Sequence, residues 1–243
     1  MDKNSFTPSE ESLDKKGFNR RRFLGWGLAT AGAVAVGVVG EKVVRTANES
    51  ARKEEALKDI TESLHKLTSQ FGLRPEENAI VVNPEKQELY VIQNNKIIEI
   101  YPVSTSKNGV GTQKGSERTP WGTHRIKEKI GDGAPEGAVF VAREQTDRVV
   151  DIIKNPIDTS EDVVTTRIMW LQGEEPNINK GEGVDSHARY IYIHGTQEEG
   201  LIGSPASHGC IRMKNKDVVE LFDSVPSGTL VEIQAREYCE PRL

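Results

Sequence analysis

The sequence predicts a mainly β, sandwich-like domain with a few short helices, preceded by a charged helical segment. Two observations favour this fold class. From residue 78 onward, short runs rich in β-branched and aromatic residues alternate with Gly, Pro, Asn and Asp, which is typical of strands joined by tight turns. Only one clear helical pattern follows, near the C-terminal end, so we expect strands to dominate the domain.

Eight runs are predicted to be strands: 79–82, 88–93, 96–104, 122–130, 138–142, 165–172, 189–194 and 229–234. Asn94-Asn95, between the second and third of these runs, predicts a tight hairpin turn. The single clear helix of the domain is expected over residues 215–225, with Asn215 as its cap and Pro226 just beyond its end.

Residues 41–75 are predicted to form a charged helical linker. Its apolar residues recur at spacings of three and four, which places them on one helical face: Leu57, Ile60, Leu64, Leu67 and Phe71. One interpretation is a coiled-coil stalk. Earlier positions in the same register are polar, which does not favour a sustained coiled coil. We therefore expect the helix to lie against the domain's own surface.

Residues 1–40 are predicted to hold an export signal or a membrane anchor after a polar, unpacked start. Three arginines, 20–22, precede an apolar run that extends from Phe23 to Gly40. This layout is typical of an export signal, and the arginine pair resembles a twin-arginine signal. A simple anchor of the same length is the alternative. We expect export to the bacterial cell envelope, to the periplasm or the outer face of the inner membrane, with the segment retained.

The composition excludes some classes of protein. The formal net charge is −5, and the chain lacks the basic surface with which nucleic-acid binders neutralise phosphates. Only Cys210 and Cys239 are present, so we expect a hydrophobic core rather than a disulfide framework to stabilise the fold. A disulfide between these two cysteines remains an alternative, although it would occupy the candidate nucleophile introduced below.

Two segments carry the residue types of nucleophilic catalysis, 190–196 and 207–213. If the first is a strand, Ile191 and Ile193 face the core, and His194 points the other way, at the strand's end next to a glycine-containing loop. A histidine on a rigid element at the edge of a cleft suits a general base.

Cys210 in the second segment is the candidate nucleophile. A free thiol has a pKa near 8.5, so a nearby imidazole has to accept its proton or pair with the thiolate. Gly209 leaves room beside the sulfur, and the Cys210 amide is a candidate oxyanion donor. We expect His194 to be the base and His208 to orient the site or stabilise the oxyanion. An inert buried thiol and a zinc site of His194, His208 and Cys210 are the alternatives.

Further histidines and apolar residues receive structural interpretations. His65 is expected to be solvated, and His124 and His187 to be structural or exposed. Met169 is expected in the core. Trp121 and Trp170 are expected to be packing residues, with Trp121 alternatively bordering the cleft.

The segment His194-Gly195-Thr196, followed by 207–212, resembles the signature of the L,D-transpeptidase catalytic domain, the YkuD family. Residues 119–123, 203–206 and Arg189 are similar to further family elements, and the resemblance covers roughly residues 78–234. It implies a catalytic domain over 76–236 followed by a tail, 237–243. The interval between the two motifs is shorter than is usual in the family, and Arg212 stands where many members have asparagine.

This resemblance implies a reaction. Cys210 attacks the carbonyl of the third residue of a peptidoglycan tetrapeptide stem and releases D-alanine. The acyl group then passes to an amine of a second stem or of an anchored wall protein. A carboxypeptidase or hydrolase that resolves the thioester with water, and a catalytically inactive wall-binding module, are the alternatives.

The resemblance also implies roles for the neighbouring residues. The Gly195 carbonyl is expected to hold the imidazole of the base, and Ser207 and Gly209 are expected on the orienting and oxyanion side together with His208. Arg212 and Tyr192 are expected to bind substrate. No metal and no cofactor are implied.

Overall fold

The computed structural model describes residues 47–159 and 161–235. Residues 47–50, at the end of a first unit (Met1–Ser50), are helical, and the second unit, Ala51–Leu243, contains all the described strands. Its helical elements are residues 51–59, α2 (Thr61–Phe71), the 3-10 turn η1 (Glu199–Leu201) and α3 (Asn215–Ser224). The strands are β1 (Ala79–Asn83), β2 (Glu88–Gln93), β3 (Lys96–Pro102), β4 (Gly122–Ile130), β5 (Ala138–Val141), β6 (Glu144–Val149), β7 (Val164–Gly173), β8 (Tyr192–Thr196), β9 (Ile211–Met213) and β10 (Leu230–Ile233).

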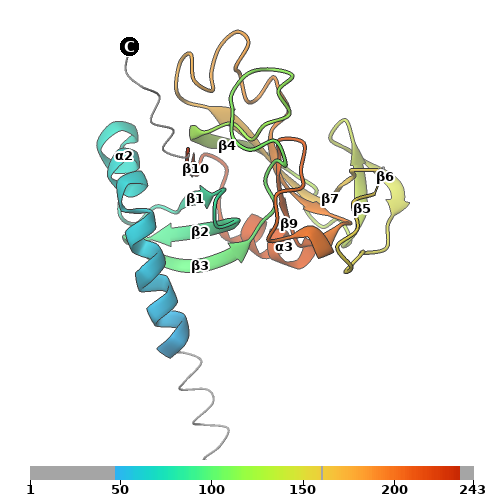
Figure 1. Cartoon of the computed structure of the whole chain (residues 1–243), viewed down its shortest axis with the longest axis horizontal. Helices are drawn as coiled ribbons and strands as arrows, with labels where there is room; N and C mark the ends of the chain where they lie inside the picture. The colour runs from blue at the N-terminus through green and yellow to red at the C-terminus, as the bar shows by residue number, and fades with distance from the viewer. Residues whose placement is uncertain (1–46, 160, 236–243) are drawn as a thin grey trace, which may run out of the picture. The chain divides into compact units, whose positions relative to one another are not determined.

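All the described strands belong to one hydrogen-bonded sheet in the order β3-β2-β1-β10-β4-β7-β5-β6, with β8 attached to β7 and β9 attached to β8. Most neighbours are antiparallel, whereas β1 pairs with β10, and β8 with β9, in parallel. The two ends of this order lie far apart, with β3 at one edge and β6 at the other (Figure 1). The prediction of a mostly β fold with a few short helices is confirmed.

Alternation along the strands separates two hydrophobic clusters. On β1, Ile80 and Val82 face the main core, which also contains apolar residues of β7, β8, β9 and α3. Ala79 and Val81 face the opposite side and pack in a second cluster. The main core is therefore enclosed by strands from distant parts of the sheet, in the manner of a sandwich.

The helical segment before β1 covers the second cluster. Ile60 and Leu67 are fully buried there against β1, β2 and β3, and Leu57, Leu64 and Phe71 pack around them. Figure 1 shows α2 beside these strands. The expectation that this helix lies on the domain's own surface is confirmed, while the boundary drawn at residue 76 stays a prediction.

Of the short sequence features, one turn was predicted correctly, two strands were missed and one helix cap was wrong. Asn94 and Asn95 form the expected two-residue turn, with φ of 52° and 57°. The sequence missed β6, whose residues are polar and largely exposed, and β9, which has only three residues. Asn215 as a helix cap is wrong: Lys214 occupies that position, and the buried Asn215 side chain donates to the Thr196 carbonyl instead.

The expected export segment lies outside the described residues, as do the tail and Cys239. Within residues 47–159 and 161–235, no helix combines the length and apolar character needed to span a bilayer.

Candidate active site

The two sequence motifs meet where β8 and β9 pair in parallel, with Ile193 opposite Ile211 and His194 opposite Arg212. Both of these isoleucines belong to the main core, and the prediction that Ile191 and Ile193 face the core is confirmed. Tyr192 and His194, one residue to either side of Ile193, therefore point to the other face of the sheet, as does Cys210 just before β9. The register thus places the candidate base on β8 and the candidate nucleophile, just before β9, on the same face.

Cys210 is a free cysteine whose side chain is partly exposed. Its Sγ accepts a hydrogen bond from the Tyr192 amide at 3.4 Å and donates to the Tyr190 carbonyl, also at 3.4 Å. Burial raises the pKa of this thiol to about 11, and the Tyr192 amide only partly opposes that effect. At neutral pH the sulfur of the free protein is therefore a neutral thiol, in contact with both backbone groups.

His194 is buried, and its Nδ1 lies 2.7 Å from the Gly195 carbonyl oxygen. Because a carbonyl can only accept, Nδ1 carries the proton and Nε2 is left as the basic nitrogen. Burial lowers the pKa of His194 to about 4, with Asp162 acting in the opposite direction. The imidazole is thus neutral, and the contact expected between Gly195 and the ring is present.

His208 is the more exposed of the two histidines, and Asp162 holds its Nδ1 at 2.9 Å. Burial acts to raise the pKa of Asp162, but Arg212 and His208 keep it below its usual value. The ionised carboxylate fixes the His208 ring and leaves its other nitrogen free to face a ligand. Sequence reasoning missed Asp162, because a lone aspartate in a polar loop 46 residues before His208 carries no signal.

Arg212 does not occupy the position expected of a substrate-binding residue. Its side chain is 1% exposed, and its guanidinium pairs with Asp162 at 2.5 Å and with buried Glu198 at 2.9 Å. Glu198 also accepts hydrogen bonds from the amide and hydroxyl of Thr159. Arg212 is therefore engaged by protein carboxylates and ties the Asp162 loop to the loop after β8.

Ser207 and Gly209 shape the turn that carries the thiol. The buried Ser207 hydroxyl donates to the Cys210 carbonyl at 2.6 Å and accepts from the Gly209 amide at 3.2 Å. Gly209 has a φ of +129°, a conformation that favours glycine, and a Cβ there would lie 3.3 Å from the Arg118 carbonyl. These contacts leave the Cys210 amide as the candidate oxyanion donor of this turn.

The strand predicted over 189–194 begins only at Tyr192. Tyr190 has a φ of +58°, and the Arg189 guanidinium turns away to bind the carbonyls of Thr112 and Arg118 at 2.8 and 2.6 Å. Tyr192 is mostly buried, with its ring edge-on to those of Trp170 and His194. The turn at Tyr190 places its carbonyl next to the thiol, a feature that alternation could not predict.

The structure also tests the alternatives. Within residues 47–159 and 161–235, no three His, Cys, Asp or Glu side chains are grouped as metal ligands would be. Met169 and Trp170 are buried, as expected, and His124 is buried and structural. His65 is exposed, and His187 stacks on Trp170 with ring centroids 3.8 Å apart.

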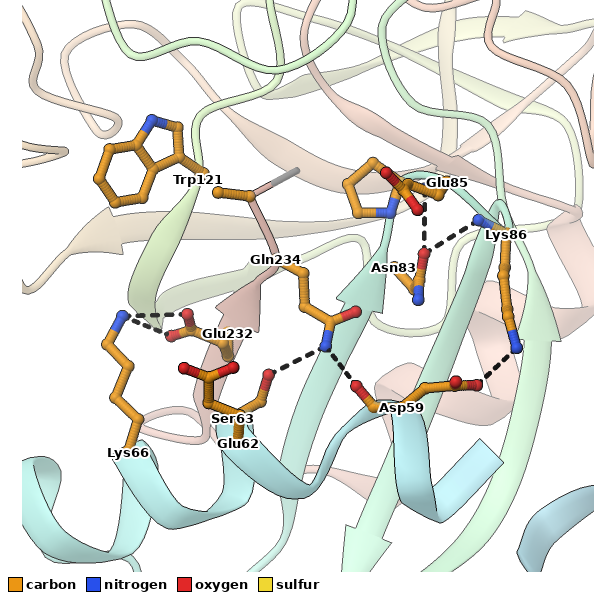
Figure 2. A pocket seen from close by; sticks show the side chains of 12 residues that line it. Asp59, Glu62, Ser63, Lys66, Asn83, Glu85, Lys86, Trp121, Glu232 and Gln234 are labelled. Carbon is orange, nitrogen blue, oxygen red and sulfur yellow. Dashed lines mark hydrogen bonds and ion pairs between the residues drawn. The ribbon is translucent and has the colours of Figure 1, made fainter. Parts of the chain in front are cut away.

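A separate cavity of about 770 Å³ lies between α2 and the ends of β1 and β10. Trp121 lines it, together with Lys66 and Glu232, which are joined by an ion pair (Figure 2). None of the residues assigned to the candidate site lines this cavity, whereas Trp121 does.

Comparison with known proteins extends these observations. "Putative L,D-transpeptidase YqjB" of Bacillus subtilis (strain 168) is 29% identical over 169 residues, covering 65% of this chain and 72% of that protein. "Putative L,D-transpeptidase YkuD" of the same strain is 58% identical over 41 residues, covering 17% of this chain but only 25% of that protein. A solved L,D-transpeptidase from Mycobacterium smegmatis has 17% identity and a TM-score of 0.40, covering 65% of this chain and 59% of that chain.

The family description "L,D-transpeptidase catalytic domain" (YkuD) matches residues 77–233, which is well over half of the chain. This span contains both motifs and all the strands described above. The resemblance inferred from the sequence is confirmed, and the chain belongs to the YkuD family of L,D-transpeptidase catalytic domains.

Proposed function

We propose that the protein is a peptidoglycan L,D-transpeptidase with Cys210 as its nucleophile. The observation that carries the proposal is the parallel pairing of β8 and β9, which presents the Cys210 sulfur and the His194 ring on one face. A partly exposed thiol and a neutral imidazole on one face of the sheet are the two groups that nucleophilic acyl transfer requires.

In the proposed first step, His194 Nε2 takes the thiol proton as the sulfur attacks the carbonyl carbon of the third stem residue. With pKa values of about 11 for the thiol and about 4 for the imidazole, the free protein holds the neutral pair. The proton therefore moves as attack proceeds, and the Gly195 carbonyl stabilises the imidazolium that forms.

The tetrahedral intermediate then collapses to a thioester. Its oxyanion is bound by the Cys210 amide, with His208 on the same side, held by Asp162. Proton transfer from the His194 imidazolium to the departing nitrogen releases D-alanine. An amine acceptor, on a second stem or on an anchored wall protein, attacks the thioester and regenerates the thiol.

The proposed place of action follows from the N-terminal segment. Three arginines before an apolar run from Phe23 to Gly40 support export to the cell envelope by the twin-arginine route, with the segment serving as an anchor. The stem peptides of the wall are the proposed partner there.

The function is tested with tetrapeptide-stem muropeptides and mass spectrometry of the products. We expect crosslinked dimers together with released D-alanine from the wild-type protein, and no product from Cys210→Ala. Tripeptides without dimers would identify hydrolysis of the same thioester, and unchanged substrate would identify a binding module; either result would contradict transpeptidation.

A further inference from the structure

The hairpin between β5 and β6 turns through two residues, Ala142 and Arg143, with φ of 49° and 72°. Left-handed conformations at two successive non-glycine residues cost free energy, and such strain persists where the surrounding structure holds it. Phe140 of β5 belongs to the apolar cluster against which Cys210 packs. The hairpin is therefore a wall of the candidate site, and its tip carries a cation.

The guanidinium of Arg143 lies over two aromatic rings, 4.6 Å from the centroid of Trp170 and 5.2 Å from that of Tyr190. Trp170 is a rigid platform, since its indole NH donates to the His187 carbonyl and the His187 ring stacks on it. The carbonyl of Tyr190 accepts the Cys210 thiol. Tyr190 therefore contacts the cation through its ring and the nucleophile through its carbonyl.

No carboxylate neutralises this cation within the described part of the chain. Arg148, on the same hairpin, is paired with Glu161 at 2.9 Å, whereas Arg143 has no ion pair there. Arg143 lies over the rings of Trp170 and Tyr190, and its strongest polar interaction is a hydrogen bond with the Tyr192 side chain, while the Glu128 carboxylate acts on it more weakly. A partly exposed guanidinium that uses one donor for Tyr192 keeps further donors with which to bind an external carboxylate through two parallel hydrogen bonds.

We propose that Arg143 is a specificity-determining residue that binds a carboxylate of the donor stem while Cys210 attacks the carbonyl carbon of the third stem residue. The proposal rests on the proposed function. A donor stem carries two carboxylates that could pair with Arg143. One is the side-chain carboxylate of a diamino acid at the third position, and the other is the C-terminal carboxylate of the leaving residue. Stacking on Trp170 holds the guanidinium plane, so its edge is already oriented when the substrate arrives.

The test compares three synthetic tetrapeptide donors: one with both carboxylates free, one amidated at the third side chain, and one amidated at the C-terminus. Acylation of Cys210 is followed by intact-protein mass spectrometry with the wild type, Arg143→Gln and Arg143→Lys. Lys96→Gln is the matched control, because it removes one positive charge at the β2–β3 hairpin, near the opposite edge of the sheet.

We expect Arg143→Gln to lower the acylation rate constant per donor concentration roughly 10- to 100-fold for the free donor, the range typical of a charge-assisted pair. Arg143→Lys should lose less, and Lys96→Gln should match the wild type. Amidation of the bound carboxylate should lower the wild-type rate and abolish the effect of Arg143→Gln, which identifies that carboxylate. An equal effect of Arg143→Gln on all three donors, or none on any, would overturn the proposal.

A binding measurement tests the role of Arg143 independently of the proposed transpeptidase activity. Calorimetric titration of Cys210→Ala with the same donors needs no turnover. If Cys210→Ala/Arg143→Gln binds the free donor and only one of the two amidated donors more weakly than Cys210→Ala does, the carboxylate site is supported even if no protein is acylated. Equal affinities in the two proteins would overturn it even if acylation were observed.

Discussion

The Nδ1 atom of His194 lies 2.7 Å from the carbonyl oxygen of Gly195, the next residue along β8. Because the backbone supplies the acceptor, the tautomer of the proposed base is fixed without a carboxylate partner. Gly195 itself cannot be enlarged, since a Cβ there would lie 2.6 Å from the Asn215 amide oxygen and 2.8 Å from the Thr165 carbonyl. The orientation of the base therefore depends on the close packing of β8 against β7 and α3.

We first expect the rate of acylation to be independent of pH over a broad range. The neutral thiol–imidazole pair and its ion-pair tautomer carry the same number of protons, so pH does not change their ratio. With pKa values of about 4 for His194 and about 11 for Cys210, kcat/KM should be flat between roughly pH 5 and pH 10. Stopped-flow acylation across that range is the measurement.

In His194→Gln the base is lost, and the thiolate must form by itself. Its rate should be about 10²- to 10⁴-fold lower at pH 7 and should rise tenfold per pH unit towards pH 10. A wild-type profile with that same slope would show that His194 does not accept the thiol proton.

Stability should fall in mild acid because two histidines are buried without charge. Burial lowers the pKa of His124 and of His194 to about 4, against about 6.5 in the unfolded chain. The contribution of these two histidines to the free energy of unfolding is complete above pH 6.5. It is lost as the pH falls towards 4, since only the unfolded chain then binds the protons. Between pH 7 and pH 5 this amounts to about 2 kcal/mol for each histidine.

Urea unfolding at the two pH values measures this loss. His194→Gln should lose about 2 kcal/mol less than the wild type over the interval, because only one of the two buried imidazoles remains. Equal losses in the two proteins would show that His194 is not held neutral by the fold.

Asp162 should position His208 and also influence the thiol. Its negative charge raises the pKa of Cys210, so Asp162→Asn should lower that pKa and speed alkylation by iodoacetamide at pH 8–9. Loss of the hydrogen bond to His208 should nevertheless slow acylation by the donor, by roughly tenfold. Asp158→Asn, an equal change of charge at an exposed position of the same loop, is the control.

Opposite signs of the two effects are the diagnostic result for Asp162. Because unfolding would also expose the thiol and speed its alkylation, the circular dichroism spectrum of Asp162→Asn must match that of the wild type. If acylation were as fast as in the wild type, the contact between Asp162 and His208 would have no catalytic role.

Much of this site followed from the sequence, for identifiable reasons. Period-two alternation and the two core isoleucines placed His194 on the correct face, and the β-rich texture gave the fold class. Asp162 and Glu198 could not be found in this way, since they reach Arg212 from two separate loops. The buried position of Arg212 depends on those loops, which is why a motif residue expected to bind substrate is engaged by the protein itself.

Local rules failed where tertiary contacts overrode them. Asn215 has the residue type of a helix cap, yet its side chain accepts from the hydroxyls of Thr165 and Thr166 and donates to the end of β8. The turn at Ala142 and Arg143 contains no glycine, so its left-handed conformation could not be predicted from the residue types. Its conformation follows from the packing of the hairpin on Trp170, which is a long-range contact.

The α2 helix should depend on a partly buried ion network beside the cavity of Figure 2. Lys66 pairs with Glu175 at 2.7 Å and with Glu232 at 3.0 Å, and Glu232 is itself buried. Lys66→Met leaves both carboxylates uncompensated and should cost on the order of 2–3 kcal/mol, below the value for a fully buried pair because Lys66 retains some exposure.

Urea unfolding gives this free energy. Lys58→Met, at an exposed position of the preceding helical residues, should change it by less than about 0.5 kcal/mol. Adding Glu232→Gln to Lys66→Met should restore part of the loss. A Lys66→Met protein as stable as the wild type would show that the network does not anchor the helix.

Trapping of the thioester shows directly whether Cys210 is the nucleophile. The wild-type protein is mixed with a tetrapeptide-stem donor, quenched in acid within seconds and analysed by intact-protein and peptide mass spectrometry. We expect an adduct with the mass of the tripeptide acyl group on the peptide that contains Cys210, and no adduct in Cys210→Ala. An adduct at any other residue, or release of D-alanine by Cys210→Ala, would contradict this expectation.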